Sequence, residues 1–504
     1  MKLTLIGHEY KYAVEQIMLT LFPEEKPVYP VNCHTGDAVL NQDVLSAESR
    51  LTIGTVYAHA TTIIQRNGIS SRGSARIKRD KLKNKLMTDR LLQKIIKQSF
   101  YRAAIDFLES PPVWGSLTGI RPAQIAAGML ESGRSIKSTV KTLTDEFYVS
   151  PERAEMCVRT ARSALSLKNR LDWRDIALYI SIPFCPTRCA YCSFVSNSVE
   201  RSFDLIEPFT NTLLREIEET AAAVRTLGLR VIAIYIGGGT PTALPADALE
   251  SVMLALDKHM DLSNLREYTV EAGRPDTVTS RHIDIISRSR ADRICINPQS
   301  MSDDVLNAIG RKHTAADILK AVGLVRQTGS LLNMDIIAGL PGDTLFDFRQ
   351  TLDTVLDLNP ENITVHTLSL KKGSRITLEG TVLPGEDAVA GMLGYASQRL
   401  YENGYEPYYL YRQKFTSGGF ENTGWSLPGR DCIYNICMME ELCTVLSLGA
   451  GGVTKLVSGG GRIERIFNAK YPREYIMQKS PDEAFTRHMD HKTGKIIDFY
   501  SNLQ

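Results

Sequence analysis

Short apolar runs and longer amphipathic stretches alternate through the middle of the chain. The apolar runs have the length of buried strands and lie at residues 176–182, 231–236, 267–272, 292–297, 332–337 and 362–368. Stretches with helical patterning separate them, at residues 203–227, 245–260, 279–289, 314–328 and 343–357. This alternation predicts parallel β/α units. Six units are too few for a closed eight-stranded barrel, so we expect an α/β fold with an open, partial (β/α)6 barrel over residues 171–385.

The regions on either side of this barrel show different patterns. Residues 1–170 contain strand-like runs at Leu3–Ile6 and near Leu51–Ile64, and the pattern becomes helical from Lys78 onward. We therefore expect an α+β amino-terminal domain that includes a basic helical segment. Because a partial barrel leaves its strand ends open to solvent, we expect residues 386–504 to form a smaller carboxy-terminal domain that closes the site.

Composition is that of an ordinary globular protein. The chain has 504 residues, of which 43% are hydrophobic and 23% are charged, and this length predicts two or three domains. The formal net charge of +2 indicates no overall bias toward nucleic acid, so we expect no nucleic acid partner. A basic run between Arg66 and Arg102, opposed by Asp80 and Asp89 alone, has two interpretations. It is either a solvated helix face, the commoner case, or a patch for nucleic acid or a polycarboxylate.

The sequence also predicts where the protein resides. No apolar run reaches the length needed to span a bilayer. The amino terminus is interrupted at once by His8, Glu9 and Lys11, so it does not have the pattern of a secretory signal. Nine cysteines without an export signal indicate a reducing compartment, and we expect a cytoplasmic protein.

Three cysteines give the clearest chemical signal. Cys185, Cys189 and Cys192 have the spacing C-x3-C-x2-C and follow directly after the first strand of the predicted barrel. Thiolates are the usual ligands of iron–sulfur clusters, and three of them would leave one iron of a [4Fe-4S] cluster free to chelate a small molecule. The alternatives are unrelated thiols or a zinc site, but structural zinc needs a fourth protein ligand. No further Cys or His lies close by in the sequence to supply it.

These motifs resemble those of the radical S-adenosylmethionine (SAM) superfamily, in which an aromatic residue, here Tyr191, precedes the last cysteine. The run Gly237–Thr242, after the second strand, is similar to the glycine motif of that superfamily. Tyr179–Cys185 resembles the group that contains oxygen-independent coproporphyrinogen III oxidases, such as HemN, and their relatives, such as HemW. Trp114–Pro122 resembles the L-T-G-x-R-P segment of its HemZ-type branch, the coproporphyrinogen dehydrogenases. The resemblance covers residues 110–460.

The resemblance implies a [4Fe-4S] cluster and S-adenosyl-L-methionine as cofactors. It implies that residues at the carboxyl ends of the strands contact the methionine amine, the methionine carboxylate and the ribose, although each could instead be a buried structural polar group. Eight residues would form this pocket: Tyr179, Tyr191, Gly239, Thr240, Glu271, Gln299, Arg311 and Asp335.

The implied activity is radical SAM oxidative decarboxylation. Propionates of coproporphyrinogen III would become vinyl groups, which yields protoporphyrinogen IX in oxygen-independent heme and porphyrin biosynthesis. The partners would be a tetrapyrrole substrate and an electron donor such as flavodoxin or ferredoxin. The alternatives are a HemW-like heme chaperone and another radical SAM tetrapyrrole enzyme, such as an anaerobic heme-degrading methyltransferase. A nucleic-acid modifier is a weaker alternative, which the basic run alone suggests.

The chain departs from the HemN pattern at two places. Ser193 and Phe194 follow Cys192 where HemN contains a further cysteine, and this absence is shared by the HemW and HemZ branches. Ser181 occupies the position of a histidine in the HemN and HemW motif. The absence of this histidine weakens the transfer of the HemN mechanism to this chain.

Aromatic and basic residues outside the barrel are candidates for substrate binding. Rings could stack on a flat tetrapyrrole while cations meet its propionates, or the same residues could be ordinary strand core and structural ion pairs. The candidates are Arg121, Tyr411, Arg412 and Lys414. A further group of cysteines, Cys432, Cys437 and Cys443, has no ligand spacing, and we expect buried thiols there.

Overall fold

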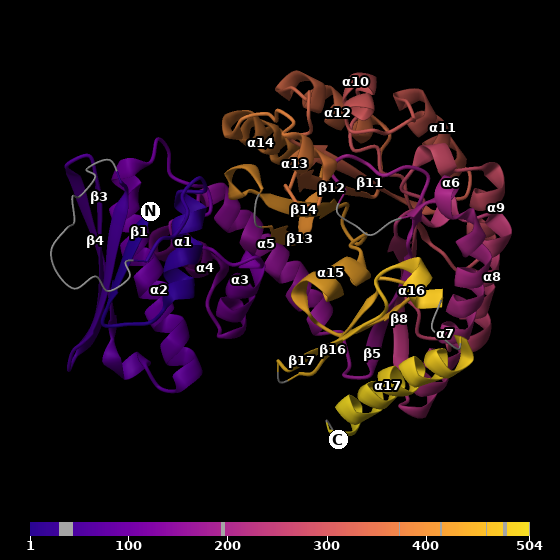
Figure 1. Ribbon diagram of the computed structural model, residues 1–504, viewed down its shortest axis with the longest axis horizontal. Coiled ribbons are helices and arrows are strands. Elements are labelled where there is room, and N and C mark those ends of the chain that lie inside the picture. Colours follow the sequence, from indigo (N-terminus) through magenta and orange to yellow (C-terminus); the bar gives the residue numbers. More distant parts are fainter. Residues whose placement is uncertain are drawn as a thin grey trace. The chain divides into compact units, whose positions relative to one another are not determined.

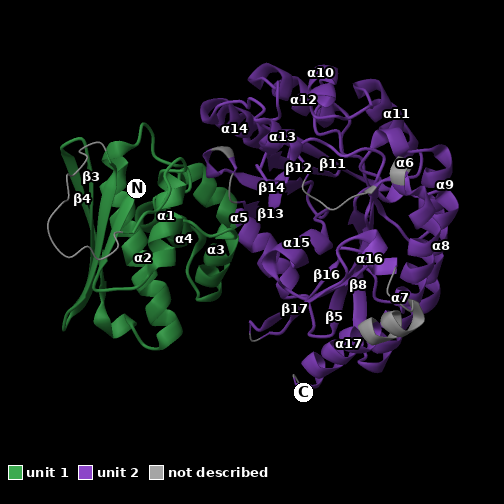
Figure 2. Ribbon diagram, in the orientation of Figure 1, with its two compact units in different colours: residues 1–158 green, residues 159–504 purple. Residues whose placement is uncertain are grey.

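The computed structural model in Figure 1 describes residues 1–29, 44–192, 197–371, 373–413, 416–459, 461–476 and 481–502. The chain divides into two compact units, Met1–Val158 and Arg159–Gln504, which Figure 2 shows in different colours. Among the described residues, no helix combines the length and the apolar character needed to cross a bilayer.

The first unit contains a sheet whose described strands lie in the order β1-β2-β3-β4. These strands are β1 (Lys2–Ile6), β2 (Ser46–Ile53), β3 (Tyr57–Arg66) and β4 (Ile69–Lys78). Strand β1 is parallel to β2, and the other pairs are antiparallel. Helices α1 (Lys11–Leu21) and α2 (Lys85–Ala104) contribute to the same core. A Cβ on Gly73 would lie 2.0 Å from the carbonyl oxygen of Ser99, so glycine is required where α2 packs on β4.

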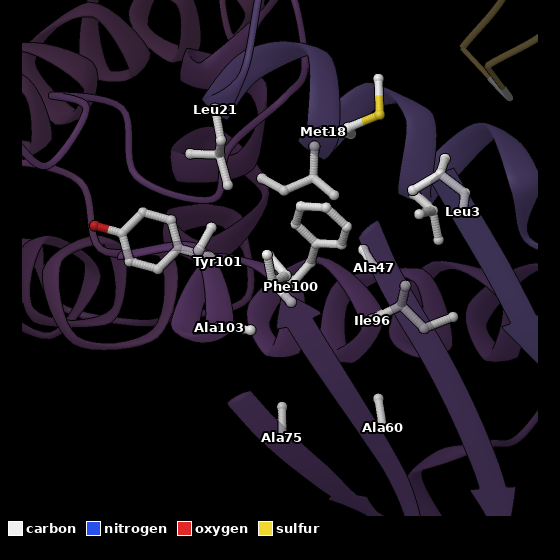
Figure 3. Close-up of a cluster of buried hydrophobic side chains, with 14 of the residues drawn as sticks. Leu3, Met18, Leu21, Ala47, Ala60, Ala75, Ile96, Phe100, Tyr101 and Ala103 are labelled. Atoms are coloured by element: carbon white, nitrogen blue, oxygen red, sulfur yellow. The ribbon is translucent and has the colours of Figure 1, made fainter. Parts of the chain in front are cut away.

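One hydrophobic core holds this sheet and its helices together. Figure 3 shows Phe100 of α2 among Met18 and Leu21 of α1 and the alanines of the strands. Small residues such as Ala60 and Ala75 on the buried side of the sheet leave room for the helix. The unit also contains α3 (Pro122–Glu131), α4 (Ile136–Phe147) and the start of α5 (Pro151–Lys168).

The second unit is built on one long sheet. The order of its described strands is β13-β14-β12-β11-β10-β9-β8-β5-β15-β16-β17. At its centre are parallel strands that follow one another in chain order, and they confirm the α/β fold and the partial barrel expected from the sequence. They are β5 (Asp175–Ile182), β8 (Arg230–Gly238), β9 (Glu267–Glu271), β10 (Arg293–Cys295), β11 (Leu331–Ala338) and β12 (Asn362–Thr367).

Helices follow these strands in the expected places. Two of them, α11 and α12, begin with capping boxes in which Thr314 and Thr344 exchange hydrogen bonds with an aspartate three residues on. The longer helices are α7 (Ile206–Thr226), α8 (Ala246–His259), α9 (Ser280–Arg288), α11 (Ala315–Arg326), α12 (Leu345–Asp357) and α14 (Glu386–Glu402). The shorter elements are β6 (Phe184–Cys185), β7 (Asn197–Ser198), α6 (Val199–Ser202), α10 (Asp303–Ala308) and α13 (Arg375–Glu379).

Residues after 385 extend the same sheet at both ends. Strand β15 (Thr444–Leu448) lies parallel to β5, and it is followed by β16 (Val453–Val457) and β17 (Ile463–Phe467). At the other end, β14 (Glu421–Ser426) is antiparallel to β12 and pairs with β13 (Glu406–Arg412). The division into two compact units therefore has no boundary at 385, because these strands cover edges that an open barrel leaves unpaired. The helices of this region are α15 (Ile433–Glu440), α16 (Pro472–Ile476) and α17 (Pro481–Ser501).

A buried ion pair joins α17 to α7. The Nζ of Lys492 lies 2.6 Å from Oε1 of Glu216, and both side chains are fully buried. Glu216 also accepts hydrogen bonds from the backbone N–H of Gly449 and from the hydroxyl of Tyr475. The carboxylate is therefore a common partner of segments that lie more than 230 residues after it in the chain.

Candidate active site

A cavity of about 610 Å³ lies at the carboxyl ends of the parallel strands. Ligand sites of β/α folds occur at this end of the sheet. The loop that contains Cys185, Cys189 and Cys192 forms one wall, and residues of β12, β13 and β14 form another. The cavity therefore joins the predicted cofactor residues to the strands that follow the barrel.

Backbone hydrogen bonds hold the cysteine loop in place. The N–H of Ala190 donates to the carbonyl of Ile309 at 2.9 Å, and the N–H of Cys192 donates to the carbonyl of Cys189 at 3.1 Å. All three cysteine side chains line the cavity. Within the described residues, no group of three His, Cys, Asp or Glu side chains is already drawn together at metal-binding distance.

Two buried arginines lie beside Cys189. Arg311 donates from Nη1 to the carbonyl of Asn297 at 2.6 Å and from Nη2 to the hydroxyl of Tyr191 at 3.1 Å. The Nη1 of Arg274 lies 3.5 Å from the Cys189 sulfur. Burial opposes ionisation of Cys189, but the charges of Arg311 and Arg274 outweigh it and lower the pKa of the thiol. A thiolate is the form that binds metals.

Arg274 was not among the residues predicted from the sequence. It binds Asp276 through Nε and Nη2, at 3.0 and 2.9 Å, and it donates to the backbone carbonyl and the hydroxyl of Thr187 inside the cysteine loop. Its position three residues after Glu271, just past the third strand, was the signal that could have identified it.

The glycine motif packs directly against the cysteine loop. A Cβ on Gly239 would lie 2.4 Å from the carbonyl oxygen of Phe184 and 3.0 Å from the sulfur of Cys185. The N–H groups of Gly239 and Thr240 donate to the carbonyls of Ile182 and Phe184 at 2.6 and 2.7 Å. Only glycine fits this approach, so the motif fixes the loop where it enters the cavity.

Polar residues from neighbouring strands form a buried cluster on the cavity floor. The hydroxyl of Tyr235 donates to Glu271 at 2.9 Å, and Asn333 donates to Asp335 at 2.9 Å. His366 Nε2 lies 3.6 Å from the second carboxylate oxygen of Asp335. His366 was missed, although its place near the end of the sixth strand satisfies the rule that selected Asp335.

The carboxylates of this cluster titrate differently. Burial, reinforced by the charge of Asp335, raises the pKa of Glu271 to about 7. Burial also disfavours the charged forms of Asp335 and His366, but their mutual attraction prevails: it lowers the pKa of Asp335 and raises that of His366. The contact therefore favours the charged forms of Asp335 and His366, while Glu271 is partly protonated near neutral pH.

Gln299 has an unusual backbone conformation at this site. Its φ is +69°, in the left-handed region that side chains other than glycine rarely adopt. Its N–H donates to the carbonyl of Asp335 and its carbonyl accepts from Ile337, at 2.9 and 3.0 Å. These bonds hold Gln299 on the cavity wall, and such conformations concentrate at functional sites.

Most predicted cofactor residues lie in this cavity. Tyr191, Gly239, Thr240, Glu271, Gln299, Arg311 and Asp335 line it together with the cysteines. Tyr179 does not line it. Its ring lies behind the wall, with ring centroids 6.2 Å from Tyr235 and 5.8 Å from Tyr434.

The predicted substrate residues are divided. Tyr411 lines the cavity. Arg412, the next residue of β13, does not, because successive side chains of a strand point to opposite faces; its Nε donates to the carbonyl of Gly419 at 3.0 Å. Arg121 lies in the first unit, at the start of α3, and Lys414 lies outside the described residues. The expected buried thiols Cys432, Cys437 and Cys443 are buried.

The wall formed by β12, β13 and β14 and the segments next to them contains residues that sequence reasoning did not select. Gln413 Oε1 and Asn422 Nδ2 are buried and have no hydrogen-bond partner among the described residues. Lys371 also lines the cavity; burial lowers its pKa, and no carboxylate in the described part of the chain pairs with it. These groups remain available to a ligand.

Comparisons with known proteins identify relatives of the chain. The model of the radical SAM superfamily matches residues 179–355. The oxygen-independent coproporphyrinogen-III oxidase-like protein HemZ of Bacillus subtilis is 36% identical over 81% of this chain and 82% of its own length. The heme chaperone HemW of Haemophilus influenzae is 28% identical over 60% of this chain and 76% of its own. The solved structure of coproporphyrinogen III oxidase HemN from Escherichia coli has the same fold, with a TM-score of 0.50 and 20% identity over 64% of this chain and 73% of its own.

Proposed function

Because the chain belongs to the radical SAM superfamily and, within it, to the family of HemZ-like oxygen-independent coproporphyrinogen-III oxidase-like proteins, we propose that it decarboxylates propionates of coproporphyrinogen III to vinyl groups. The observation that supports this most is a single cavity with two kinds of wall. One wall contains the three cysteines and the glycine motif, and the other contains tyrosines, unpaired amide groups and Lys371.

The residues of the first wall fit a cluster with bound S-adenosylmethionine. Gly239 leaves a cradle against Cys185 that a side chain would fill, and Arg311 Nε and Asn297 Oδ1 are buried without a partner among the described residues. A guanidinium suits a carboxylate, and an amide oxygen can accept from an amine. Cys185, Cys189 and Cys192 would hold the cluster. When bound, this pair of cofactors supplies the hydrogen abstraction that starts a radical decarboxylation.

The chain orients the reactants and excludes water. Arg274 and Arg311 place positive charge beside Cys189 and stabilise its thiolate. His366, with Nε2 3.6 Å from Asp335, helps to hold this carboxylate on the cavity floor, where it can accept hydrogen bonds from ribose hydroxyls. Tyr409 and Tyr411 of β13 also line the cavity and would keep the reacting carbon away from solvent.

Three residues of the cavity, Lys371, Gln413 and Asn422, would bind the substrate. A propionate carboxylate near Lys371 would gain a charge-assisted contact. The free Asn422 N–H and Gln413 oxygen could bind other polar groups of the ligand. The role of Arg121, the choice of electron donor and the cytoplasmic location stay predictions.

Anaerobic assay of the reconstituted protein tests the proposal. The assay contains S-adenosylmethionine, dithionite or reduced flavodoxin as electron donor, and an added one-electron acceptor. For each propionate that reacts, we expect loss of carbon dioxide, of one hydrogen atom to S-adenosylmethionine and of one electron to the acceptor, which leaves a vinyl group detectable by mass spectrometry. The Cys185→Ala, Cys189→Ala and Cys192→Ala variants should form neither methionine nor vinyl product. Cys437→Ala, which changes a buried thiol away from the cavity, is the matched control and should retain its iron.

A second function has support from the HemW relatives and from the sequence after Cys192. In that case the chain would be a heme chaperone. Tight heme binding, with no vinyl product from coproporphyrinogen III, would favour the chaperone over the decarboxylase. Methyl transfer to heme would instead favour an anaerobic heme-degrading methyltransferase.

A further inference from the structure

The sheet of the first unit has one buried and one open face. Along β3, Ala58, Ala60 and Ile64 are fully buried against the core. The alternate residues His59, Thr61 and Ile63 are partly exposed, and their side chains point to the other face. Helix α2 packs on the buried side of β3 and β4, and within the described residues of this unit no helix covers the other.

The open face is strongly basic. Strand pairing aligns β1–β4 so that the same face receives every second residue of each strand. The cations on it are Lys2, Arg50, Arg72, Arg76 and Lys78, all of them exposed. Among the described strands, Glu48 is the one carboxylate on this face, and it pairs with Arg50 at 3.0 Å. An excess of four positive charges therefore faces solvent.

Rings and hydroxyl groups lie between these cations. The guanidinium of Arg76 stacks over the ring of Tyr57, at 4.8 Å from its centroid. The register places Arg76 opposite His59, and Ser74 opposite Thr61. In the described part of the chain, no ion pair engages Arg72 or Lys78. The face thus combines free positive charge with hydrogen-bonding groups and aromatic surface.

We propose that this open face binds the backbone of a single-stranded nucleic acid. Arg76 and Lys78 are two residues apart along β4, so their side chains emerge about 7 Å from each other on one side of the strand. A line of cations interleaved with rings is typical of surfaces that follow a phosphate backbone. Proteins that lie on membranes combine cations with Trp, Phe or Leu, and the open face has none of these among its described residues. The proposal is independent of the activity in the second unit.

The position of β4 suggests a competing explanation. It is the last strand of its sheet, and charged side chains on an edge strand prevent association with other sheets. Edge protection needs charge of either sign, whereas nucleic acid binding needs positive charge. Charge reversal therefore separates the two roles.

The test measures fluorescence anisotropy of labelled 20-nucleotide oligo(U) and oligo(dT) with the full-length protein. The variant R72E/R76E/K78E reverses three cations of the open face. The matched control, K83E/K85E/R90E, reverses three cations of the same basic run that lie in or just before α2. We expect the first variant to bind at least 10-fold more weakly, with a salt slope smaller by about 2, and the control to bind as the unmodified protein does.

Several outcomes would overturn the proposal. These are equal losses in both variants, no binding of either oligonucleotide at 50 mM salt, or binding of anionic lipid vesicles alone. Melting temperatures of all proteins show whether the reversal disturbs the unit. If the charge-reversal variant melts at a lower temperature, the neutral variant R72Q/K78Q is used in its place. This variant should still weaken binding several-fold. Preference for oligo(U) over oligo(dT) would indicate recognition of the ribose hydroxyls, and equal affinity would indicate the backbone alone.

Discussion

At the scale of single residues, two adjacent positions that were both predicted to bind substrate have different surroundings. Tyr411 faces the cavity, while Arg412 is buried behind it and donates to Gly419. Burial lowers the pKa of Arg412 to about 10, because desolvation disfavours the charged guanidinium. Its hydrogen bond to Gly419 offsets part of this unfavourable energy. Lys371, in contrast, lines the cavity without an ion-pair partner among the described residues.

We expect Lys371→Ala to weaken binding of a carboxylated porphyrin by about 1.5–3 kcal/mol, the value of one hydrogen bond to a charged group. Arg412→Ala should leave the affinity per folded molecule unchanged and lower the melting temperature. Porphyrin titration followed by fluorescence, alongside thermal melts, measures both effects. Equal affinity of Lys371→Ala and the unmodified protein would remove Lys371 from the substrate site.

Glu271 predicts a dependence of stability on pH. Its pKa is about 7 in the folded protein and 4.5 for the free side chain, so the folded state retains a proton that the unfolded state loses. The contribution of Glu271 to the free energy of unfolding is therefore fully present below pH 4.5. It is lost as the pH rises through 7, and the loss is at most about 3 kcal/mol. The Glu271→Gln variant cannot ionise and should gain stability relative to the unmodified protein between pH 5 and pH 8. Urea denaturation at pH 5 and pH 8 measures the difference in free energy of unfolding between the variant and the unmodified protein. The same difference at both pH values would contradict ionisation of Glu271 in this range.

Site residues can be predicted from the sequence when they belong to a short motif with a characteristic spacing. Cys185, Cys189, Cys192 and the glycine motif belong to this class. Arg274 and Lys371 do not, because each is a single polar residue after a strand, and its role depends on which distant segments lie next to it. The alternation of β13 was not assigned, and this is why Arg412 was selected together with Tyr411.

At the scale of elements, one buried ion pair connects the carboxy-terminal helix to the barrel. Glu216 of α7 binds Lys492 of α17, and it also receives the N–H of Gly449 after β15. Removing one partner of a buried pair leaves the other charge without compensation, which is far costlier than the loss of an exposed pair.

We expect Lys492→Met to reduce the free energy of unfolding by about 3–5 kcal/mol. The double variant Glu216→Gln, Lys492→Met should regain part of this loss, because no buried charge then remains. Arg288→Met breaks the exposed pair with Asp284 and serves as the control, with a change below about 1 kcal/mol. Chemical denaturation monitored by circular dichroism gives the three values. A double variant less stable than Lys492→Met would show that the carboxylate itself, rather than its unpaired charge, is the important group.

Elements with regular patterning were predictable, and their partners were not. The strands of the barrel were found within a few residues of their observed ends, since buried parallel strands are continuous apolar runs. Strand β4 was not predicted, because its alternating cations leave few apolar residues to reveal the period. Its cations were counted in a basic run whose commoner interpretation was a solvated helix face. The open basic face of the first unit therefore became apparent only with the register of β3 and β4.

At the scale of the whole molecule, each unit has the features of an independent folding domain. The core that contains Phe100 and Ile96 is formed by residues of the first unit alone. Its 158 residues, Met1–Val158, are in the usual size range for a domain with one core.

We expect a fragment of residues 1–158 to fold alone and to unfold cooperatively. The isolated fragment should match one of two calorimetric transitions of the full-length chain, because the first unit has a hydrophobic core of its own. Phe100→Ala should shift that transition alone, with a cost of about 3–5 kcal/mol. A fragment without a cooperative transition would mean that its core requires the second unit.

The pairing of β5 with β15 has a consequence for biosynthesis. The hydroxyl of Ser181, at the end of β5, donates to the carbonyl of Ala450, which lies 269 residues later in the chain. A ribosome adds 5–20 residues per second, so the nascent strand that leads to the cysteines waits roughly 13–54 seconds for this neighbour. During that interval one edge of the strand is unpaired and prone to pair with other chains. Cys185, Cys189 and Cys192 directly follow this strand, so their thiols are synthesised long before the sheet beside them can close.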